Sequence, residues 1–340
     1  MTTPDPVQAF RELTPDQLLD SVEACFLGEL GKYTDGRFLA LNSYENRVYQ
    51  IGVEDDVNLV AKFYRPQRWS DQSIIEEHQF TRELEDAEIP VIAPLANTAG
   101  DTLFQHVPFR FAIYPCRGGR PTELDNPEHM LQMGRFIGRI HAIGAGQLYH
   151  SRPVIDLDSY IHTPSKFLLE GSFIPIHLEE AYSSLTKVLA EQVQFCYDRA
   201  GSVASIRLHG DFHPGNVLWT DSGPHIVDFD DARNGPAVQD LWMFLSGDRG
   251  YMETMLAKLL QGYCQFYHFD PIELHLLEAL RTMRMIYHAG WLASRWEDPA
   301  FPIAFPWFNS TSYWESHVLG LREQSALMQE QPLSWERGAG

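Results

Sequence analysis

The stretch that decides the fold reads LHGDFHPGN at residues 208–216, and the stretch VDFD follows it at residues 227–230. Together they place Asp211, then Asn216 five residues later, and then Asp228 at the end of a short apolar run. An aspartate can accept the proton of an attacking hydroxyl, while amide and carboxylate oxygens suit Mg²⁺ held on ATP phosphates. The spacing therefore predicts a phosphotransfer site of the protein-kinase type, with an ordinary turn network as the alternative.

Length and composition are typical of a soluble enzyme. At 340 residues the chain can bury one large core or fold as two lobes. It has no apolar run long enough for a transmembrane helix, and its first residues lack the pattern of a signal peptide. The cysteines are scattered without CxxC spacing, which predicts neither a zinc site nor a disulfide framework. Since reduced thiols are typical of the cytoplasm, we expect a cytoplasmic protein. We also expect it to be a monomer.

The charge balance is strongly acidic, with 26 basic and 46 acidic residues and a net charge of −20. Proteins that bind nucleic acid normally present a basic face. We therefore expect neither a nucleic acid nor an anionic membrane as a partner. The acidity has two interpretations, which are solubility and the attraction of a basic or neutral substrate.

Strand-like patterns dominate the chain before about residue 116. The runs at residues 47–53 and 59–64 flank an acidic turn, which predicts a hairpin. A helix is expected over residues 73–87, because its apolar residues keep roughly helical spacing. Further strands are expected at 102–107 and 109–114. The breaker-rich run at 115–121 predicts a linker.

The chain after the linker is expected to be mainly helical. The expected helices include residues 130–143, 178–200, 238–245, 252–267 and 272–296. The fold class is therefore α+β, with a small antiparallel N-lobe at residues 1–115 and a larger helical C-lobe at residues 116–340. We expect the N-lobe to position ATP phosphates and the C-lobe to carry the catalytic loop, the metal site and the acceptor. A nucleotide is expected in the cleft between two such lobes.

Lys62 lies in the second strand of the hairpin, within the run VAKF. Its position resembles that of the strand lysine that pairs with ATP phosphates in kinases. A lysine in an apolar strand can also extend to solvent. The phosphate-binding lysine needs an acidic partner on the helix, and both Glu76 and Glu77 qualify by position. We prefer Glu77, which shares a helical stripe with Leu84; as an alternative, both glutamates are solvated surface charges.

The phosphate-covering turn departs from the glycine-rich kinase pattern. No G-x-G-x-x-G precedes the hairpin, and the corresponding turn reads LNSYEN at residues 41–46. The Ser43 hydroxyl and nearby amides can donate to phosphate oxygens. A plain turn is the alternative.

The motifs HGDFHPGN at 209–216 and DFDDA at 228–232 resemble those of the aminoglycoside phosphotransferase and choline kinase superfamily, which shares the protein-kinase fold. Longer motifs resemble the bacterial stress response kinase A family more closely: residues 41–50, 62–66, 76–80, 230–243 and 296–302. The likeness covers roughly residues 14–335. It implies a Mg²⁺- and ATP-dependent serine/threonine protein kinase that protects bacteria from stress-induced cell death. Its partners would be ATP and a protein substrate.

The resemblance also implies roles for single residues. Asp211 and Asp228 would be catalytic, with Asp211 as the base toward the acceptor hydroxyl. Asn216 and Asp228 would bind Mg²⁺. Lys62, held by Glu77, would position phosphates.

Other positions complete the implied site. Ser43 would contact ATP, and Tyr114 to Cys116 would supply backbone hydrogen bonds to adenine. Asp240 is expected to bond the backbone near Asp211. Asp230 stands where the Asp-Phe-Gly motif of protein kinases has glycine. No Ser, Thr or Tyr lies within residues 231–240, so regulation by phosphorylation is not expected there.

Three function classes remain open: a protein kinase, a pseudokinase that acts as a binding module, and a small-molecule kinase for an amino alcohol, sugar or aminoglycoside. The presence of Lys62, Asp211, Asn216 and Asp228 argues against the pseudokinase. An acidic pocket beyond Asp211 would favour a cationic small molecule, and an open groove would favour a polypeptide.

Overall fold

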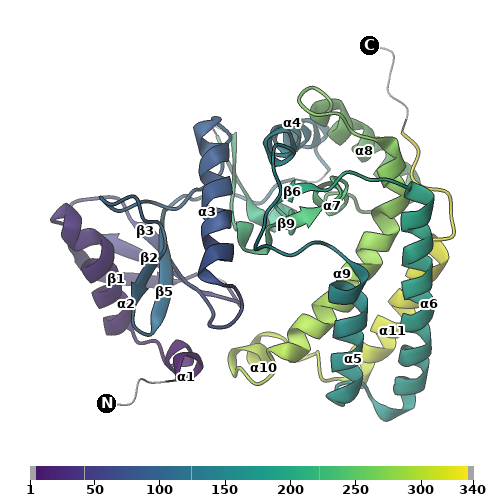
Figure 1. Cartoon of the computed structure of the whole chain (residues 1–340), viewed down its shortest axis with the longest axis horizontal. Coiled ribbons are helices and arrows are strands. Elements are labelled where there is room, and N and C mark those ends of the chain that lie inside the picture. The colour runs from purple at the N-terminus through teal and green to yellow at the C-terminus, as the bar shows by residue number, and fades with distance from the viewer. Residues whose placement is uncertain (1–4, 42, 124, 222, 336–340) are drawn as a thin grey trace. The chain divides into compact units, whose positions relative to one another are not determined.

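The computed structural model describes residues 5–41, 43–123, 125–221 and 223–335 (Figure 1). The chain divides into two compact units. The first comprises Met1–Thr122, Tyr149–Arg152 and Gly215–Asp231, and the second comprises Glu123–Leu148, Pro153–Pro214 and Ala232–Gly340. The first unit contains an antiparallel sheet and the second is mainly helical, so the expected α+β class is confirmed. The division at residues 115 and 116, with a role for each lobe, stays a prediction.

The first unit is built on a five-stranded antiparallel sheet in the order β1-β2-β3-β5-β4. Its strands are β1 (Thr34–Ala40), β2 (Arg47–Val53), β3 (Leu59–Phe63), β4 (Phe104–His106) and β5 (Phe109–Pro115). The expected hairpin is confirmed as β2 and β3, whose register sets Val48 opposite Lys62. Side chains alternate along a strand, so Ala61 and Phe63 enter the core while Lys62 points to the other face.

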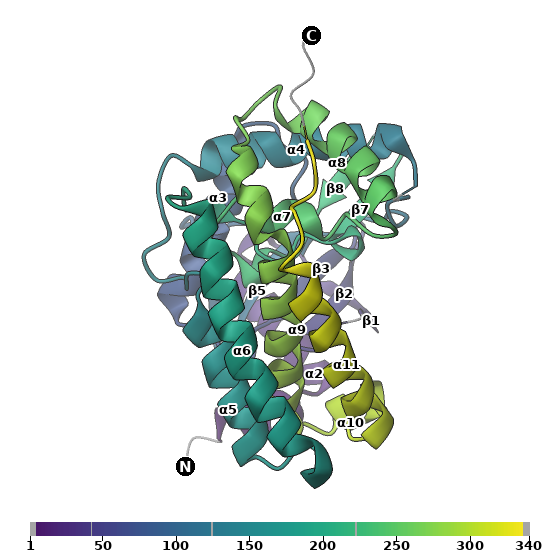
Figure 2. The same ribbon diagram turned by 90° about the vertical axis from the view of Figure 1, so that its right-hand side faces the viewer.

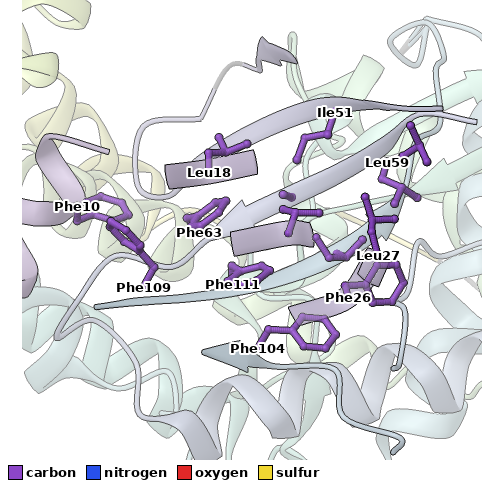
Figure 3. Close-up of a cluster of buried hydrophobic side chains, with 14 residues drawn as sticks. Phe10, Leu18, Phe26, Leu27, Ile51, Leu59, Phe63, Phe104, Phe109 and Phe111 are labelled. Atoms are coloured by element: carbon purple, nitrogen blue, oxygen red, sulfur yellow. The ribbon is translucent and has the colours of Figure 1, made fainter. Parts of the chain in front are cut away.

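Aromatic and aliphatic side chains fill one face of this sheet (Figure 3). Short N-terminal helices cover that face: α1 (Pro6–Arg11), α2 (Pro15–Val22), η1 (Glu23–Leu27) and η2 (Gly28–Leu30). A capping box of Thr14 and Gln17 starts α2. The rings of Phe63 and Phe111 stack at 4.9 Å between centroids. Each such buried side chain stabilises the fold by about 1.5–3 kcal/mol, which fixes the strand that carries Lys62.

Helix α3 (Asp71–Asp86) and a second hairpin complete the first unit. Ser70 caps α3 by accepting a hydrogen bond from the Ser73 amide, and the helix expected at residues 73–87 is confirmed. The second hairpin consists of β7 (Val217–Thr220) and β8 (Gly223–Ile226), followed by the 3₁₀ turn η5 (Phe229–Asp231). Bridges from Val91 and Arg120 tie this hairpin to the earlier part of the unit.

The long helices of the second unit are α4 (Pro127–Gly144), α6 (Ile176–Ala200), α8 (Arg249–Tyr263), α9 (Leu277–Ser294) and α11 (Thr311–Leu327). Its shorter elements are η3 (Asp158–His162), α5 (Thr163–Glu170), α7 (Gln239–Trp242), η6 (Pro271–Leu276), α10 (Ala300–Ala304) and the strand pair β6 (Ile206–Leu208) and β9 (Arg233–Gly235). Figure 2 shows α9 alongside α5, α6 and α11, with which it makes contact.

Some expected helix bounds in the second unit were wrong. The helix expected over residues 238–245 is the single turn α7, and the one expected to reach residue 267 ends at Tyr263. The helix expected over residues 272–296 begins with the 3₁₀ segment η6, because Pro271 and the Asp270 cap start a separate turn. No helix in the described residues is both long and apolar enough to cross a membrane.

Candidate nucleotide and phosphotransfer site

The loop that carries Asp211 is held by a buried carboxylate of the same unit. Asp240 accepts hydrogen bonds from the backbone amides of His209 (2.8 Å) and Gly210 (2.9 Å), which confirms that it bonds the backbone near Asp211. His141 Nε2 lies 3.1 Å from Asp240 Oδ2, the oxygen that also accepts from the His209 amide. Gly210 has a φ of +85°, a conformation that a side chain would strain. The loop therefore has one well-defined backbone path.

Asp211 itself lies among basic side chains of the second unit. Its Oδ1 atom lies 2.6 Å from Arg284 Nη1 of α9, and its Oδ2 atom lies 3.6 Å from His213 Nε2. A salt bridge to a guanidinium fixes the carboxylate in one orientation. Sequence reasoning missed Arg284, because it lies 73 residues after Asp211 and outside the motifs at residues 208–216 and 227–230.

A cavity of about 310 Å³ lies on the face of the first unit's sheet that carries Lys62. Among its lining residues are six of the expected site residues: Ser43, Lys62, Glu77, Tyr114, Asn216 and Asp228. The expected Cys116 follows the lining residue Pro115 and is half-buried. Asn42, in the same expected turn as Ser43, lies outside the described residues. Apolar side chains, including Val48, Val60 and Leu218, form other parts of the wall.

Lys62 is buried in this cavity and paired with two carboxylates. Its Nζ atom lies 3.0 Å from Asp228 and 3.1 Å from Asp230. Burial lowers the pKa of Lys62, but Asp228, Asp230 and Glu77 outweigh it, so the pKa lies well above its ordinary value. The amine is therefore a fixed cation at neutral pH.

Glu77 makes a different contact from the one expected. Its carboxylate lies 2.8 Å from Arg152, while the ion pairs of Lys62 within the described residues go to Asp228 and Asp230. Glu77 acts on Lys62 through its charge rather than through a direct ion pair. The carboxylate of Asp230 accounts for the difference, because it forms the ion pair with Lys62 that was expected of Glu77.

Glu76 and Glu77 have different surroundings in the structure. Glu76 accepts hydrogen bonds from the amides of His150 and Ser151, whereas Glu77 lines the cavity. Arg152 also donates to the carbonyls of Ser73 and Asp230. No local sequence pattern predicts these contacts of Glu76, Glu77 and Arg152, because about 75 residues separate each residue from its partner.

Asp230 is the centre of a buried ion network that sequence reasoning missed. Arg68 Nη1 lies 2.9 Å from Asp230 and 3.4 Å from Glu45, two residues beyond Ser43. Burial raises the pKa of Asp230, but Arg68, Lys62 and Arg152 outweigh it and hold the pKa well below its ordinary value. We call these five residues, Glu45, Lys62, Arg68, Arg152 and Asp230, the Asp230 network. It links the Ser43 turn to the cavity lysine.

Asn216 and Asp228 bring an amide oxygen and a carboxylate to this cavity, and both groups suit a hard metal ion. Asp228 is exposed and has a φ of +63°, a left-handed conformation that costs of order 1–3 kcal/mol for a non-glycine residue. Such strain is typical of functional sites. The described residues contain no cluster of three His, Cys, Asp or Glu side chains able to hold a metal. One amide and one carboxylate fit Mg²⁺, which often takes its other ligands from phosphates and water.

Comparison with known proteins gives the family. Residues 37–277 match the model of the phosphotransferase enzyme family. The chain belongs to this family. It is 45% identical over 324 residues to stress response kinase A of Escherichia coli K12, which covers 95% of this chain and 96% of that protein. It is 43% identical, with the same coverage, to the serine/threonine protein kinase RdoA of Salmonella typhimurium. The resemblance to stress response kinase A is thus confirmed, and the chain is an ATP-dependent phosphotransferase.

This chain also aligns with solved structures of other kinases. The amicoumacin kinase hAmiN, in complex with AMP-PNP, Ca²⁺ and Ami, aligns with a TM-score of 0.71 at 17% identity and covers 94% of both chains. A microcompartment-associated aminopropanol kinase aligns with a TM-score of 0.65 at 14% identity, over 86% of this chain and 91% of its own. These likenesses confirm the expected two-lobed, kinase-like fold.

Proposed function

We propose that this phosphotransferase is a Mg²⁺-dependent protein kinase that transfers the γ-phosphoryl group of ATP to Ser or Thr in a bacterial stress response. The observation that carries the chemistry is that Ser43, Lys62, Asn216 and Asp228 all line one cavity. The names of the two curated relatives support the protein acceptor and the stress role.

The first unit would bind the nucleotide. Val48, Val60 and Leu218 offer apolar walls for the adenine ring, and the backbone from Tyr114 to Cys116 would hydrogen-bond its edge. Lys62 would bind phosphate oxygens, since buried carboxylates keep it charged and in place. The Ser43 hydroxyl would donate to the same phosphates, with its turn held by Glu45 and Arg68.

Asn216 and Asp228 would hold Mg²⁺ through their side-chain oxygens. A bound Mg²⁺ ion would neutralise charge on the β- and γ-phosphates. Lys62, 3.0 Å from Asp228, would keep that carboxylate oriented in the nucleotide-free chain.

Asp211 would act as the base. The acceptor hydroxyl would lose its proton to Asp211, its oxygen would form the new P–O bond, and the bond to ADP would break. Asp240 would serve this step by fixing the backbone of the loop.

We also propose that the chain acts in the cytoplasm as a monomer, without a nucleic-acid or membrane partner. Its cysteines are free, as expected in a reducing compartment, and its net charge of −20 disfavours polyanions.

The experiment is ATP turnover against a protein panel and a metabolite panel, with Asp211→Asn as the control. A small-molecule acceptor is the second candidate, because the hAmiN and aminopropanol kinase structures share the fold. Transfer to Ser or Thr of proteins, lost in the control, supports the proposal. Transfer to metabolites alone would replace it with the second candidate.

A further inference from the structure

A stripe of half-buried side chains on α9 lies beside Asp211 in the second unit. Tyr287 and His288 follow Arg284 by three and four residues, and Trp291 follows these two by four and three, which places all four on one face of α9. Arg284 contacts Asp211 at 2.6 Å, so this face of α9 is next to the proposed base. We call these four residues the α9 stripe. It contains no acidic side chain.

The stripe is held firmly at its centre. Tyr287 stacks on Tyr160 with 4.6 Å between ring centroids. The Arg233 guanidinium lies over both rings and donates a hydrogen bond of 2.6 Å to the Tyr160 hydroxyl. These contacts hold the turn of α9 from which Arg284 extends.

His288 does not add a positive charge to the stripe at neutral pH. Burial and Arg284 lower its pKa to about 4, against the opposing effect of Asp211. Arg284 is therefore the permanent cation of the α9 stripe.

Arg284 differs from the structural arginines near it. Arg281, one turn earlier on α9, pairs with Glu278 at 3.0 Å and lies over the Trp242 ring. Arg233 is buried against its two tyrosines. Arg284 is 31% exposed, and among the described residues its ion-pair partner is Asp211. A guanidinium has five donors, so Arg284 retains the capacity to bind a second anion beside the base.

We infer that Arg284 selects the acceptor, and that the hydroxyl phosphorylated by this chain has a negative charge beside it, as in Ser or Thr flanked by Asp or Glu. The inference rests on the proposed function. As that hydroxyl gives its proton to Asp211 and takes the phosphoryl group from ATP, Arg284 binds the neighbouring carboxylate. A cationic acceptor would meet a guanidinium at the same place.

The overall acidity of the chain does not decide this preference. Charges separated by more than about 8 Å are largely screened at physiological salt, whereas Arg284 would contact the acceptor directly. One interpretation of the acidic total is attraction of a basic substrate, whereas the local charge of Arg284 predicts the opposite preference. A peptide assay separates the two.

The test compares synthetic serine peptides that differ only in flanking Asp, Ala or Lys residues, together with choline and ethanolamine as cationic acceptors. We expect kcat/KM to be at least tenfold higher for the Asp-flanked than for the Lys-flanked peptide. Arg284→Gln should remove this preference mainly through KM of the Asp-flanked peptide, and Arg284→Glu should reverse it. Arg284→Lys should keep its direction.

Arg281→Gln is the matched control, since it removes the same charge from the same helix without a contact to Asp211. It should keep the wild-type preference. A preference for Lys-flanked peptides, or an equal loss of kcat for all peptides in Arg284→Gln, would overturn the inference and leave the protein-kinase proposal intact. Transfer to choline or ethanolamine alone, or to none of the acceptors, would contradict both.

Discussion

At the scale of single residues, Asp230 changes the kinase site most. Protein kinases have glycine at this position, and here a buried carboxylate pairs with Lys62 and Arg68. The cations keep it ionised, so it acts as a fixed counter-charge. It also takes the place that Glu77 was expected to hold beside Lys62.

Replacing Asp230 should therefore destabilise the chain and weaken ATP binding. Asp230→Gly restores the Asp-Phe-Gly sequence but leaves two buried cations with less compensation, a loss of about 3–5 kcal/mol in the free energy of unfolding. KM for ATP should rise, because Lys62 loses one of its anchors. Chemical denaturation and ATP titration measure the two effects. Asp56→Asn, which breaks a surface pair with Lys32, should cost far less than Asp230→Gly; equal costs would contradict a structural role for the network.

His78 gives a prediction for pH. It is buried between the Tyr64 hydroxyl and the Thr102 hydroxyl, each at 2.8 Å. Burial, Lys62 and Arg152 lower its pKa from 6.5 to about 3. Below pH 6.5 the unfolded chain thus binds a proton that the folded chain does not, and stability falls as the pH falls.

The expected loss at His78 is about 1.4 kcal/mol per pH unit between pH 6 and pH 4. In His78→Gln, the slope of unfolding free energy against pH should decrease by about one proton. Urea denaturation at several pH values measures it. An unchanged slope would show that His78 is protonated in the folded chain.

At the scale of elements, the backbones of helices α4 and α8 pack very closely in the second unit. Helices α4 and α8 meet where glycines replace side chains. A Cβ atom on Gly134 would lie 1.9 Å from the Leu259 carbonyl oxygen, and one on Gly262 would lie 2.1 Å from the Leu131 carbonyl oxygen. Because His141 of α4 also contacts Asp240, this packing positions the loop that carries Asp211.

Gly134→Ala should lower the free energy of unfolding by about 1–3 kcal/mol, because a methyl group does not fit between the two backbones. Gly250→Ala in α8 is the control: its nearest neighbour would lie 3.6 Å away, and alanine favours a helix. Thermal unfolding should place the melting temperature of Gly134→Ala below the wild type and that of Gly250→Ala at or above it. The reverse order would contradict the packing account.

The sequence predicted local elements well and distant contacts poorly. Helix α3 and the β2–β3 hairpin could be predicted, since their side chains repeat with the period of one element. Strand β1 and the β7–β8 hairpin were missed, because β1 pairs with β2 in an irregular register, and β7 and β8 are only four residues each. The motifs named the residues that line the cavity, but not Arg152, Arg68 or Arg284, which reach it or Asp211 from distant segments.

At the scale of the whole molecule, the proposed reaction requires both units. The first contains the cavity with Lys62, Asn216 and Asp228, and the second contains Asp211 and the α9 stripe. The chain passes from the second unit to the first between Pro214 and Gly215, within the motif at residues 208–216. One short motif therefore supplies the base from one unit and a metal ligand from the other.

The central claim is that Asp211 accepts the proton of the acceptor hydroxyl, while Asn216 and Asp228 bind the metal ion. The measurement is a Mg²⁺ titration of phosphotransfer for the wild type, Asp211→Asn, Asn216→Ala and Asp228→Ala. Asn216→Ala should need more Mg²⁺ for half-maximal activity and should recover partly at high Mg²⁺ or with Mn²⁺, because the amide supplies one ligand among several.

Asp228→Ala should be more severe, since it removes a charge as well as a ligand. Asp211→Asn should lose about 10²–10⁴-fold in rate, keep ATP binding and show no rescue at any metal concentration. Wild-type metal dependence in Asn216→Ala and Asp228→Ala, or a wild-type rate in Asp211→Asn, would contradict the account.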